Sequence, residues 1–113
     1  MTGNEYQKLA MRTTRDEWKN TNCWDQKVHA IVGLSSEAGE VASILQHMYQ
    51  GEVMNPDNLK KEIGDCLWFI AEICEAFNME MDDIMQSNID KLIKRYPDGF
   101  SDERSRNRNE EEV

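Results

Sequence analysis

Apolar residues recur along most of this chain at spacings of three and four, which is the period of one face of an α-helix. The longest such stretch runs from residue 25 to about residue 50, with Asp25 placed to cap its start and Gly51 placed to end it. Its apolar face consists of Val28, Ile31, Leu34, Val41, Leu45 and Met48. We therefore expect a long amphipathic helix here.

A second long helix is predicted for residues 57–77. Asn55-Pro56-Asp57 joins a capping residue to a proline that suits the first helical turn, and Asn78 is placed to stop the helix. The apolar face contains Leu59, Ile63, Leu67, Ile70, Cys74 and Phe77. Because the connection from the preceding helix is short, the two helices are expected to form a hairpin.

Shorter helices are predicted on either side of this hairpin. One covers residues 4–18 with Asn4 as its cap, followed by a loop at residues 19–22. The other covers residues 81–95 and ends at Tyr96-Pro97, because proline disfavours helix at the residue before it. Its apolar face contains Ile84, Met85, Ile89, Leu92 and Ile93. The pattern therefore predicts an all-α domain over residues 1–100, a four-helix bundle.

The last thirteen residues, 101–113, differ from the rest in composition. They contain no large apolar residue before Val113, and their arginines and the run Glu110-Glu111-Glu112 crowd together. Such a segment cannot bury enough apolar surface to offset the entropy of ordering it. We expect a charged, disordered tail.

The net charge of the chain and the length of its apolar runs argue against some classes of function. Thirteen basic against twenty-two acidic side chains give a net charge of -9, which argues against a nucleic-acid polymer as the main partner but leaves small phosphates possible. No apolar run approaches the roughly 18 residues that span a membrane, and the N-terminus lacks the pattern of a signal peptide. Three cysteines without a C-x-x-C pair indicate reduced thiols. We expect a cytoplasmic protein that does not enter membranes.

Two pairs of acids border the apolar faces of the hairpin, Glu37-x-x-Glu40 and Glu62-x-x-Asp65. Residues three apart share a helix face, so the two pairs can face each other. Four converging carboxylates repel one another unless a cation neutralises them, and hard oxygen ligands suit Mg2+ or Mn2+. Two ordinary solvated faces are the alternative interpretation.

Gly33 and Gly39 lie within the first long helix, where each costs about 1 kcal/mol relative to alanine. Such glycines suggest that another group approaches the helix closely, although a merely tolerated glycine is the alternative. Further along the chain, Asn88, Lys91 and Arg95 share one face of the last helix and could hold phosphate oxygens. Solvated positive charge near a helix C-terminus explains the two cations equally well.

Three ordered blocks resemble the MazG-like nucleotide pyrophosphohydrolases over about residues 5–100. They are Gly33-Leu34-Ser35-Ser36-Glu37-Ala38-Gly39-Glu40, then Leu59-x-x-Glu62-Ile63-Gly64-Asp65-x-Leu67-Trp68, then Asn88-x-x-Lys91-Leu92-x-x-Arg95-Tyr96-Pro97-x-Gly99-Phe100. The resemblance implies an all-α homodimer or dimer of dimers. It also implies Mg2+-dependent cleavage of a nucleoside triphosphate to the monophosphate and pyrophosphate. This chain has one such domain where larger members carry two, so a second copy is expected to complete the core.

Carried over by position, the resemblance makes the four acids metal ligands and puts the face of Asn88, Lys91 and Arg95 near the substrate phosphates. The implied reaction is attack of a metal-activated water on the α-phosphorus, with Glu37 or Glu40 orienting or deprotonating that water. Trp18, Trp24 and His29 precede the acids, and an aromatic ring there could stack on the base. A core or dimer contact is the alternative for the tryptophans, and Trp68 is expected in the core.

Two rival functions remain open from the sequence. One is a related all-α phosphohydrolase that acts on dUTP, a phosphoribosyl nucleotide or an alarmone. The other is a non-catalytic helical dimer that binds a nucleotide or a protein partner. A di-iron carboxylate bundle is disfavoured, because no helix carries a Glu-x-x-His pair. The base, the sugar, the number of metal ions and the biological role are not determined by these motifs.

Overall fold

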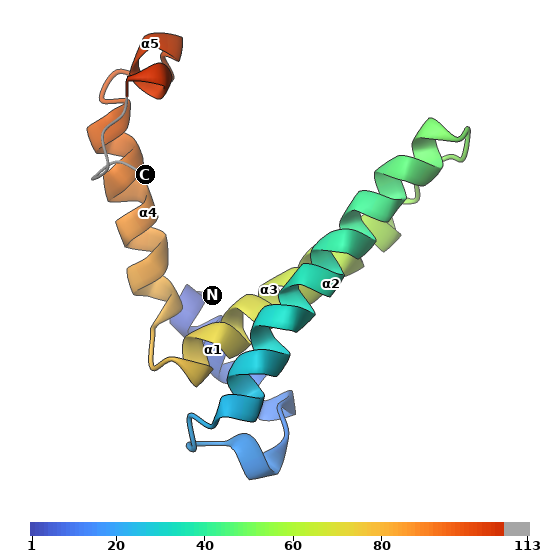
Figure 1. The fold of residues 1–113 in the computed structure, drawn as a ribbon, viewed down its shortest axis with the longest axis vertical. Helices are drawn as coiled ribbons and strands as arrows, with labels where there is room; N and C mark the ends of the chain where they lie inside the picture. Colours follow the sequence, from blue (N-terminus) through green and yellow to red (C-terminus); the bar gives the residue numbers. More distant parts are fainter. Residues whose placement is uncertain (108–113) are drawn as a thin grey trace.

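The computed structural model describes residues 1–107, which are helical with short connections (Figure 1). The described residues contain no β-strand, and a single bridge joins Pro97 to Gly99. The elements in order are α1 (Gly3–Ala10), the 3-10 turns η1 (Met11–Thr13) and η2 (Asp16–Trp18), α2 (Trp24–Tyr49), α3 (Pro56–Ala76), α4 (Met81–Arg95) and α5 (Asp102–Arg106). The predicted all-α class is confirmed.

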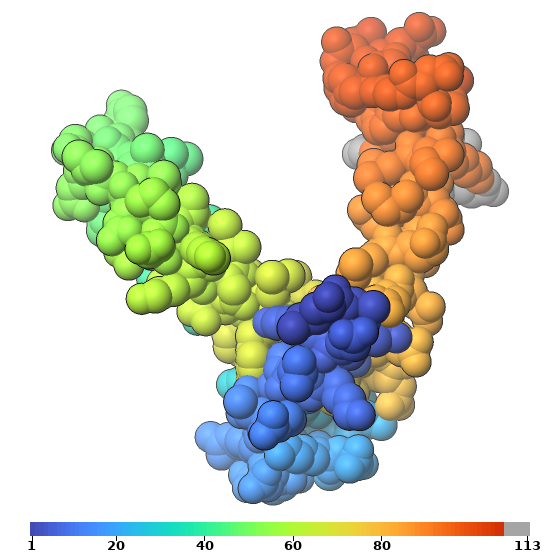
Figure 2. Space-filling view, turned by 180° about the vertical axis from the view of Figure 1, so that it is seen from behind, coloured from blue at the N-terminus to red at the C-terminus, as the bar shows by residue number. Residues whose placement is uncertain are grey.

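The helices are arranged as a V rather than as a four-helix bundle. One arm is the hairpin of α2 and α3, the other is α4, and α1 lies where the arms meet (Figures 1 and 2). The radius of gyration is 17.1 Å, whereas a compact domain of this length has about 13 Å. The prediction of a four-helix bundle is therefore wrong for the single chain, because α4 packs against α1 and diverges from the hairpin.

The hairpin forms where the sequence indicates it. Gly51 follows α2 with φ of 99°, a left-handed conformation that glycine adopts without steric cost. The side chain of Asn55 accepts a hydrogen bond of 2.9 Å from the N–H of Asp57, and Pro56 opens α3. The helix α3 ends at Ala76, Phe77 is its C-cap residue, and Asn78 follows with φ of 56°. These stop and start signals bring α2 and α3 side by side over most of their length (Figure 1).

The first helix is shorter than predicted and is capped differently. It ends at Ala10 and passes into the 3-10 turns, and its cap is Thr2, whose hydroxyl accepts from the N–H of Glu5. The helix α2 begins after Cys23 without a side-chain cap, so Asp25 lies in its first turn rather than capping it. Asn4, predicted as a cap, belongs to a different contact, which joins α1 to α4.

This contact fixes the angle between the arms. The Oδ1 of Asn4 accepts from the N–H of Asp82 at 3.0 Å, and the Oδ1 of Asp82 accepts from the N–H of Asn4 at 3.2 Å. The buried side chain of Gln7 donates to the carbonyl of Met79 and accepts from the N–H of Met81. The buried amide of Gln7 is paired on both sides, and the loss of either bond would leave a buried polar group without a partner.

The core is small and lies at the meeting point of the arms. It consists of Ala10, Met11, Ala71, Cys74 and Met81, with Tyr6, Trp68 and Ile70 packed against it. Cys74 is 1% exposed and behaves as the small apolar residue expected there. The predicted apolar faces are, by contrast, largely exposed: Ile31 is 52%, Ile63 47% and Ile89 49% exposed. In a single chain, α1 covers the arms only where they meet, and the V leaves apolar side chains along both arms exposed.

Two further observations concern the ends and the surface. Residues 102–106, within the predicted disordered tail, form the short helix α5 with Ser101 as its cap, and residues 108–113 lie outside the described part. Among residues 1–107, no helix has the length and apolarity that crossing a membrane requires.

Candidate functional site

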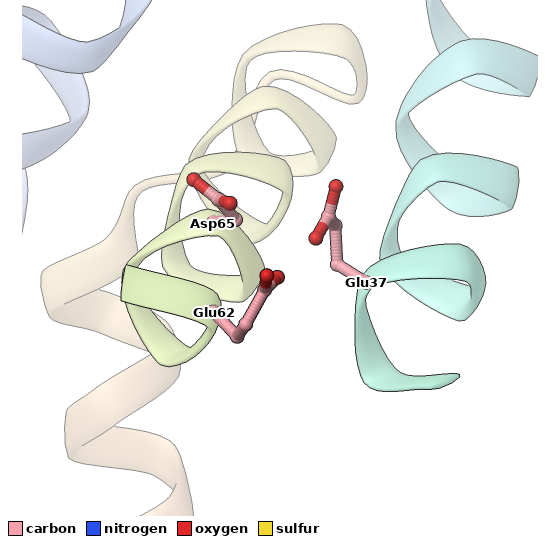
Figure 3. Close-up of side chains that lie close together, drawn as sticks. All are labelled: Glu37, Glu62 and Asp65. Carbon is pink, nitrogen blue, oxygen red and sulfur yellow. The ribbon is translucent and has the colours of Figure 1, made fainter. Parts of the chain in front are cut away.

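Three acids converge between α2 and α3. Glu37 projects from α2 toward Glu62 and Asp65, which lie one helical turn apart on α3 (Figure 3). One carboxylate oxygen from each residue lies within 4.8 Å of the others. The hairpin produces this meeting, because it brings the face of the first acid pair opposite the face of the second.

Without a cation between them, the three carboxylates of this cluster repel one another. Desolvation, a hydrogen bond with Glu62 and the charges of Asp65, Glu62 and Glu40 raise the pKa of Glu37. Desolvation and the charges of Glu37, Asp65 and Glu62 likewise raise the pKa of the Cys66 thiol. A set of converging hard oxygen donors that repel one another fits a divalent cation such as Mg2+.

The fourth predicted ligand, Glu40, is placed differently. It is exposed and lies outside the group of three, although its charge acts on Glu37 one turn away on α2. The structure thus brings together three of the four acids and leaves Glu40 at the border of the cluster.

The glycines near the acids have different surroundings. A Cβ at Gly33 would overlap the ring of Phe69, so only glycine lets α3 approach α2 this closely. No atom lies within 4 Å of a Cβ built at Gly39 or at Gly64. The predicted close approach is confirmed at Gly33 and is absent at Gly39 in the single chain.

The cationic face predicted to meet phosphates lies on the other arm of the V. Asn88, Lys91 and Arg95 belong to α4, which diverges from the acids of the hairpin (Figure 1). Arg95 is 8% exposed, its guanidinium lies 5.7 Å from the ring centre of Tyr96, and its carbonyl accepts from Arg104. Within one chain, these three residues and the three converging acids are not brought together.

A pocket of about 470 Å³ adjoins the acids through Asp65. Four aromatic rings, those of Trp18, His29, Trp68 and Phe69, line it. Thr13, Thr14, Arg15, Asp65 and Glu72 complete the lining. His29 therefore lines the same pocket as Asp65, whereas Trp24 is 74% exposed and does not line the pocket. Trp68 both packs against the core and lines the pocket.

Sequence reasoning missed the polar residue at the back of this pocket. Glu72 is fully buried, its carboxylate lies 2.5 Å from the Nδ1 of His29, and it accepts a hydrogen bond of 3.0 Å from the hydroxyl of Thr14. A signal was present, because Glu72 is the one charged residue in the apolar run of residues 66–74. Burying a single acidic side chain among apolar residues is energetically costly unless another buried group binds it.

Comparison with known proteins identifies the family. The model of the MazG nucleotide pyrophosphohydrolase domain matches residues 27–100, more than half of the chain. The chain belongs to this family. The matched MazG segment contains the whole acid cluster, His29 and all of α3 and α4. It leaves out α1, the two 3-10 turns and the residues between them, a segment that includes the pocket residues Thr14 and Trp18.

Part of the chain is also similar to a curated phage protein. The chain is 28% identical over 72 residues to the Gene 37 protein of Mycobacterium phage L5. That similarity covers 59% of this chain and 63% of the phage protein. No solved structure matches the chain.

Proposed function

We propose that this protein is a Mg2+-dependent nucleoside triphosphate pyrophosphohydrolase, which converts an NTP or dNTP to the monophosphate and pyrophosphate. The observation that carries the proposal is the convergence of Glu37, Glu62 and Asp65 in the hairpin of a chain of the MazG family. These three carboxylates would hold Mg2+, or Mn2+ in its place, with Glu40 as a further ligand or as the base.

When bound, the cation supplies positive charge to the phosphate oxygens and lowers the pKa of a coordinated water. A water oxygen forms a bond to the α-phosphorus while the bond from that phosphorus to the bridging oxygen breaks, so the electron pair leaves with pyrophosphate. A carboxylate takes the proton of the water. Between Glu37 and Glu40, we favour Glu40 for this role, because it borders the cluster without belonging to it.

We propose that a second copy of the chain completes the site in a homodimer or a dimer of dimers. The exposed apolar residues of both arms support this assembly, since α4 of a single chain meets the hairpin near Met81 and leaves most of the hairpin's apolar face exposed. In such an assembly, α4 of one copy could bring Asn88, Lys91 and Arg95 to the acids of the other. Their cationic and amide groups would then bind the phosphates.

The test is to incubate the protein with each common NTP and dNTP plus Mg2+ and to identify the products by chromatography. Monophosphate plus pyrophosphate is expected, with the activity lost on addition of EDTA. Asp65→Asn should lower kcat/KM by at least about 100-fold, because it removes a metal ligand. Glu75→Gln is the matched control, since Glu75 also lies on α3 but outside the acid cluster.

Other outcomes distinguish the rival functions. Diphosphate plus phosphate would contradict the proposed reaction. Turnover confined to dUTP, a phosphoribosyl nucleotide or an alarmone would place the protein among the related phosphohydrolases. Binding of Mg2+ and nucleotide without any turnover would indicate the non-catalytic dimer.

A further inference from the structure

A second cavity, of about 410 Å³, is lined by residues 4–20 together with Glu75 of α3 and Glu80, the residue before α4. We call it the N-terminal cavity. Its volume falls within the roughly 300–1,000 Å³ of small-molecule sites. It shares only Thr14 with the aromatic pocket, the one lined by Trp18, His29, Trp68 and Phe69, and it contains none of the three converging acids. Most of its lining precedes residue 27, where the family match begins.

The buried part of this lining consists of Gln7, Met11 and Thr14, which are 9%, 6% and 7% exposed. Their polar groups already have partners inside the protein. The amide of Gln7 pairs with main-chain groups at the start of α4, and the hydroxyl of Thr14 donates to Glu72. The groups left to bind a ligand are therefore the more exposed side chains of the lining, most of which are charged.

These charged side chains come from two parts of the chain. Lys8, Arg12 and Lys19 belong to the N-terminal segment, whereas Glu75 and Glu80 lie at the two ends of the α3–α4 connection. Lys19 is already bound at 2.8 Å to an acidic side chain three residues earlier. Within residues 1–107, the other two cations form no ion pair, and neither do the two carboxylates. Two cations and two carboxylates thus line one cavity beyond ion-pair distance from each other.

This arrangement of charges favours one class of ligand. A simple anion is attracted by the cations and repelled by the carboxylates, and the reverse holds for a simple cation. A molecule that carries a negative group at one end and a positive group at the other makes charge-assisted hydrogen bonds to both sets. A nucleoside triphosphate, which has several negative charges and no positive one, is not matched to this lining.

We propose that the N-terminal cavity binds a small zwitterion, with its carboxylate at Lys8 and Arg12 and its protonated amine at the carboxylates of Glu75 and Glu80. Free amino acids and short peptides have this chemistry. The site is separate from the acid cluster, so the inference goes beyond the proposed function and does not depend on it.

The experiment titrates the full-length protein with glycine, 4-aminobutyrate and 6-aminohexanoate, using isothermal titration calorimetry at low salt. The fatty acid and the alkylamine of the same length as each probe carry only one of the two charges. At least one zwitterion should bind about 10-fold more tightly than both of its single-charge counterparts, because it alone contacts both sets of side chains. Preference for glycine would indicate a free α-amino acid, and preference for a longer probe would indicate a short peptide.

Variants assign the binding to particular side chains. Lys8→Met combined with Arg12→Met should weaken binding of the preferred zwitterion by at least about 10-fold, and Glu80→Gln should weaken it as well. Glu80 makes no side-chain cap hydrogen bond to α4, so its replacement leaves the start of that helix intact. Lys60→Met and Asp90→Asn, which lie outside the cavity, are the matched controls and should leave binding unchanged.

Amide chemical shifts locate the bound probe. The preferred zwitterion should shift resonances of residues 4–20 and 75–80, and shifts confined to residues 65–72 would overturn the assigned site. Equal binding of a zwitterion and its single-charge counterparts, or no binding at about 10 mM, would overturn the proposed ligand class. If circular dichroism shows that a variant does not fold, the comparison of probes and the shifts of the wild type still decide. No nucleotide is needed, so failure here leaves the proposed pyrophosphohydrolase untouched, and a lack of turnover leaves this inference untouched.

Discussion

At the scale of single residues, the acid cluster that we propose as the Mg2+ site also destabilises the folded chain. Glu37, Glu62 and Asp65 converge although each charge disfavours the others, and desolvation together with those charges raises the pKa of Glu37. A carboxyl whose pKa is raised by folding binds its proton more tightly in the native state than in the unfolded state. Its ionisation therefore lowers stability as the pH rises above the unfolded pKa.

The first prediction concerns the melting temperature without metal. Glu37→Gln should raise the Tm measured in EDTA at pH 8, because it removes a charge that the folded state disfavours. The gain should diminish as the pH is lowered and the wild-type carboxyl takes up its proton. Mg2+ should raise the Tm of the wild type and have little effect on the variant. A Tm in EDTA below that of the wild type would show that the three charges do not oppose folding.

The sequence reveals some of these residues and hides others for a physical reason. Glu37, Glu62 and Asp65 are recognisable because spacings of three on two hairpin helices determine where they point. The pocket depends instead on where the chain before α2 folds back, which carries Thr14 and Trp18 against α3. Local periodicity contains no information about that contact. A buried acid such as Glu72 can be suspected from its apolar neighbours, but its partners come from distant segments.

At the scale of elements, α2 and α3 approach each other closely at Gly33. The ring of Phe69 occupies the space that a Cβ would need, and the same ring lines the aromatic pocket. The helix α2 therefore supplies the first acid and also sets the position of one wall of the pocket. Capping and turn residues predicted the ends of this hairpin, whereas the direction of α4 depends on contacts with α1 that are 78 residues apart in the chain.

The second prediction tests the contact at Gly33. Gly33→Ala should lower the free energy of unfolding by about 1–2 kcal/mol, because the overlap with Phe69 outweighs the gain in helix propensity. Gly39→Ala is the matched control on the same helix, and it should raise the free energy by about 0.5–1 kcal/mol, because its Cβ meets nothing. Urea unfolding at a fixed protein concentration measures both. Equal changes in the two variants would contradict the close approach.

At the scale of the whole molecule, the V has more exposed apolar surface than a stable monomer is expected to tolerate. Apolar residues of α2, α3 and α4 are half exposed, and large contiguous apolar surfaces mark interaction sites. The sequence predicted these apolar faces correctly but not their separation, because periodicity tells which side chains need cover and not which chain provides it. A second copy can provide that cover.

The third prediction follows from these exposed faces. Sedimentation equilibrium of the wild type should give at least twice the 13.2 kDa of one chain. Ile89→Asp together with Ile93→Asp should reduce the mass toward that of one chain, because both residues lie on the exposed apolar face of α4. Asp90→Asn is the control on the same helix. A wild type that sediments as one chain at micromolar concentration would contradict the assembly.

The reaction at the acid cluster is tested most directly by hydrolysis of the preferred triphosphate in water enriched in oxygen-18, with mass spectrometry of both products. Attack on the α-phosphorus predicts one labelled oxygen in the nucleoside monophosphate and none in the pyrophosphate. The same two products with the label in pyrophosphate would show attack on the β-phosphorus, and would contradict the role that we give to Glu37, Glu40, Glu62 and Asp65.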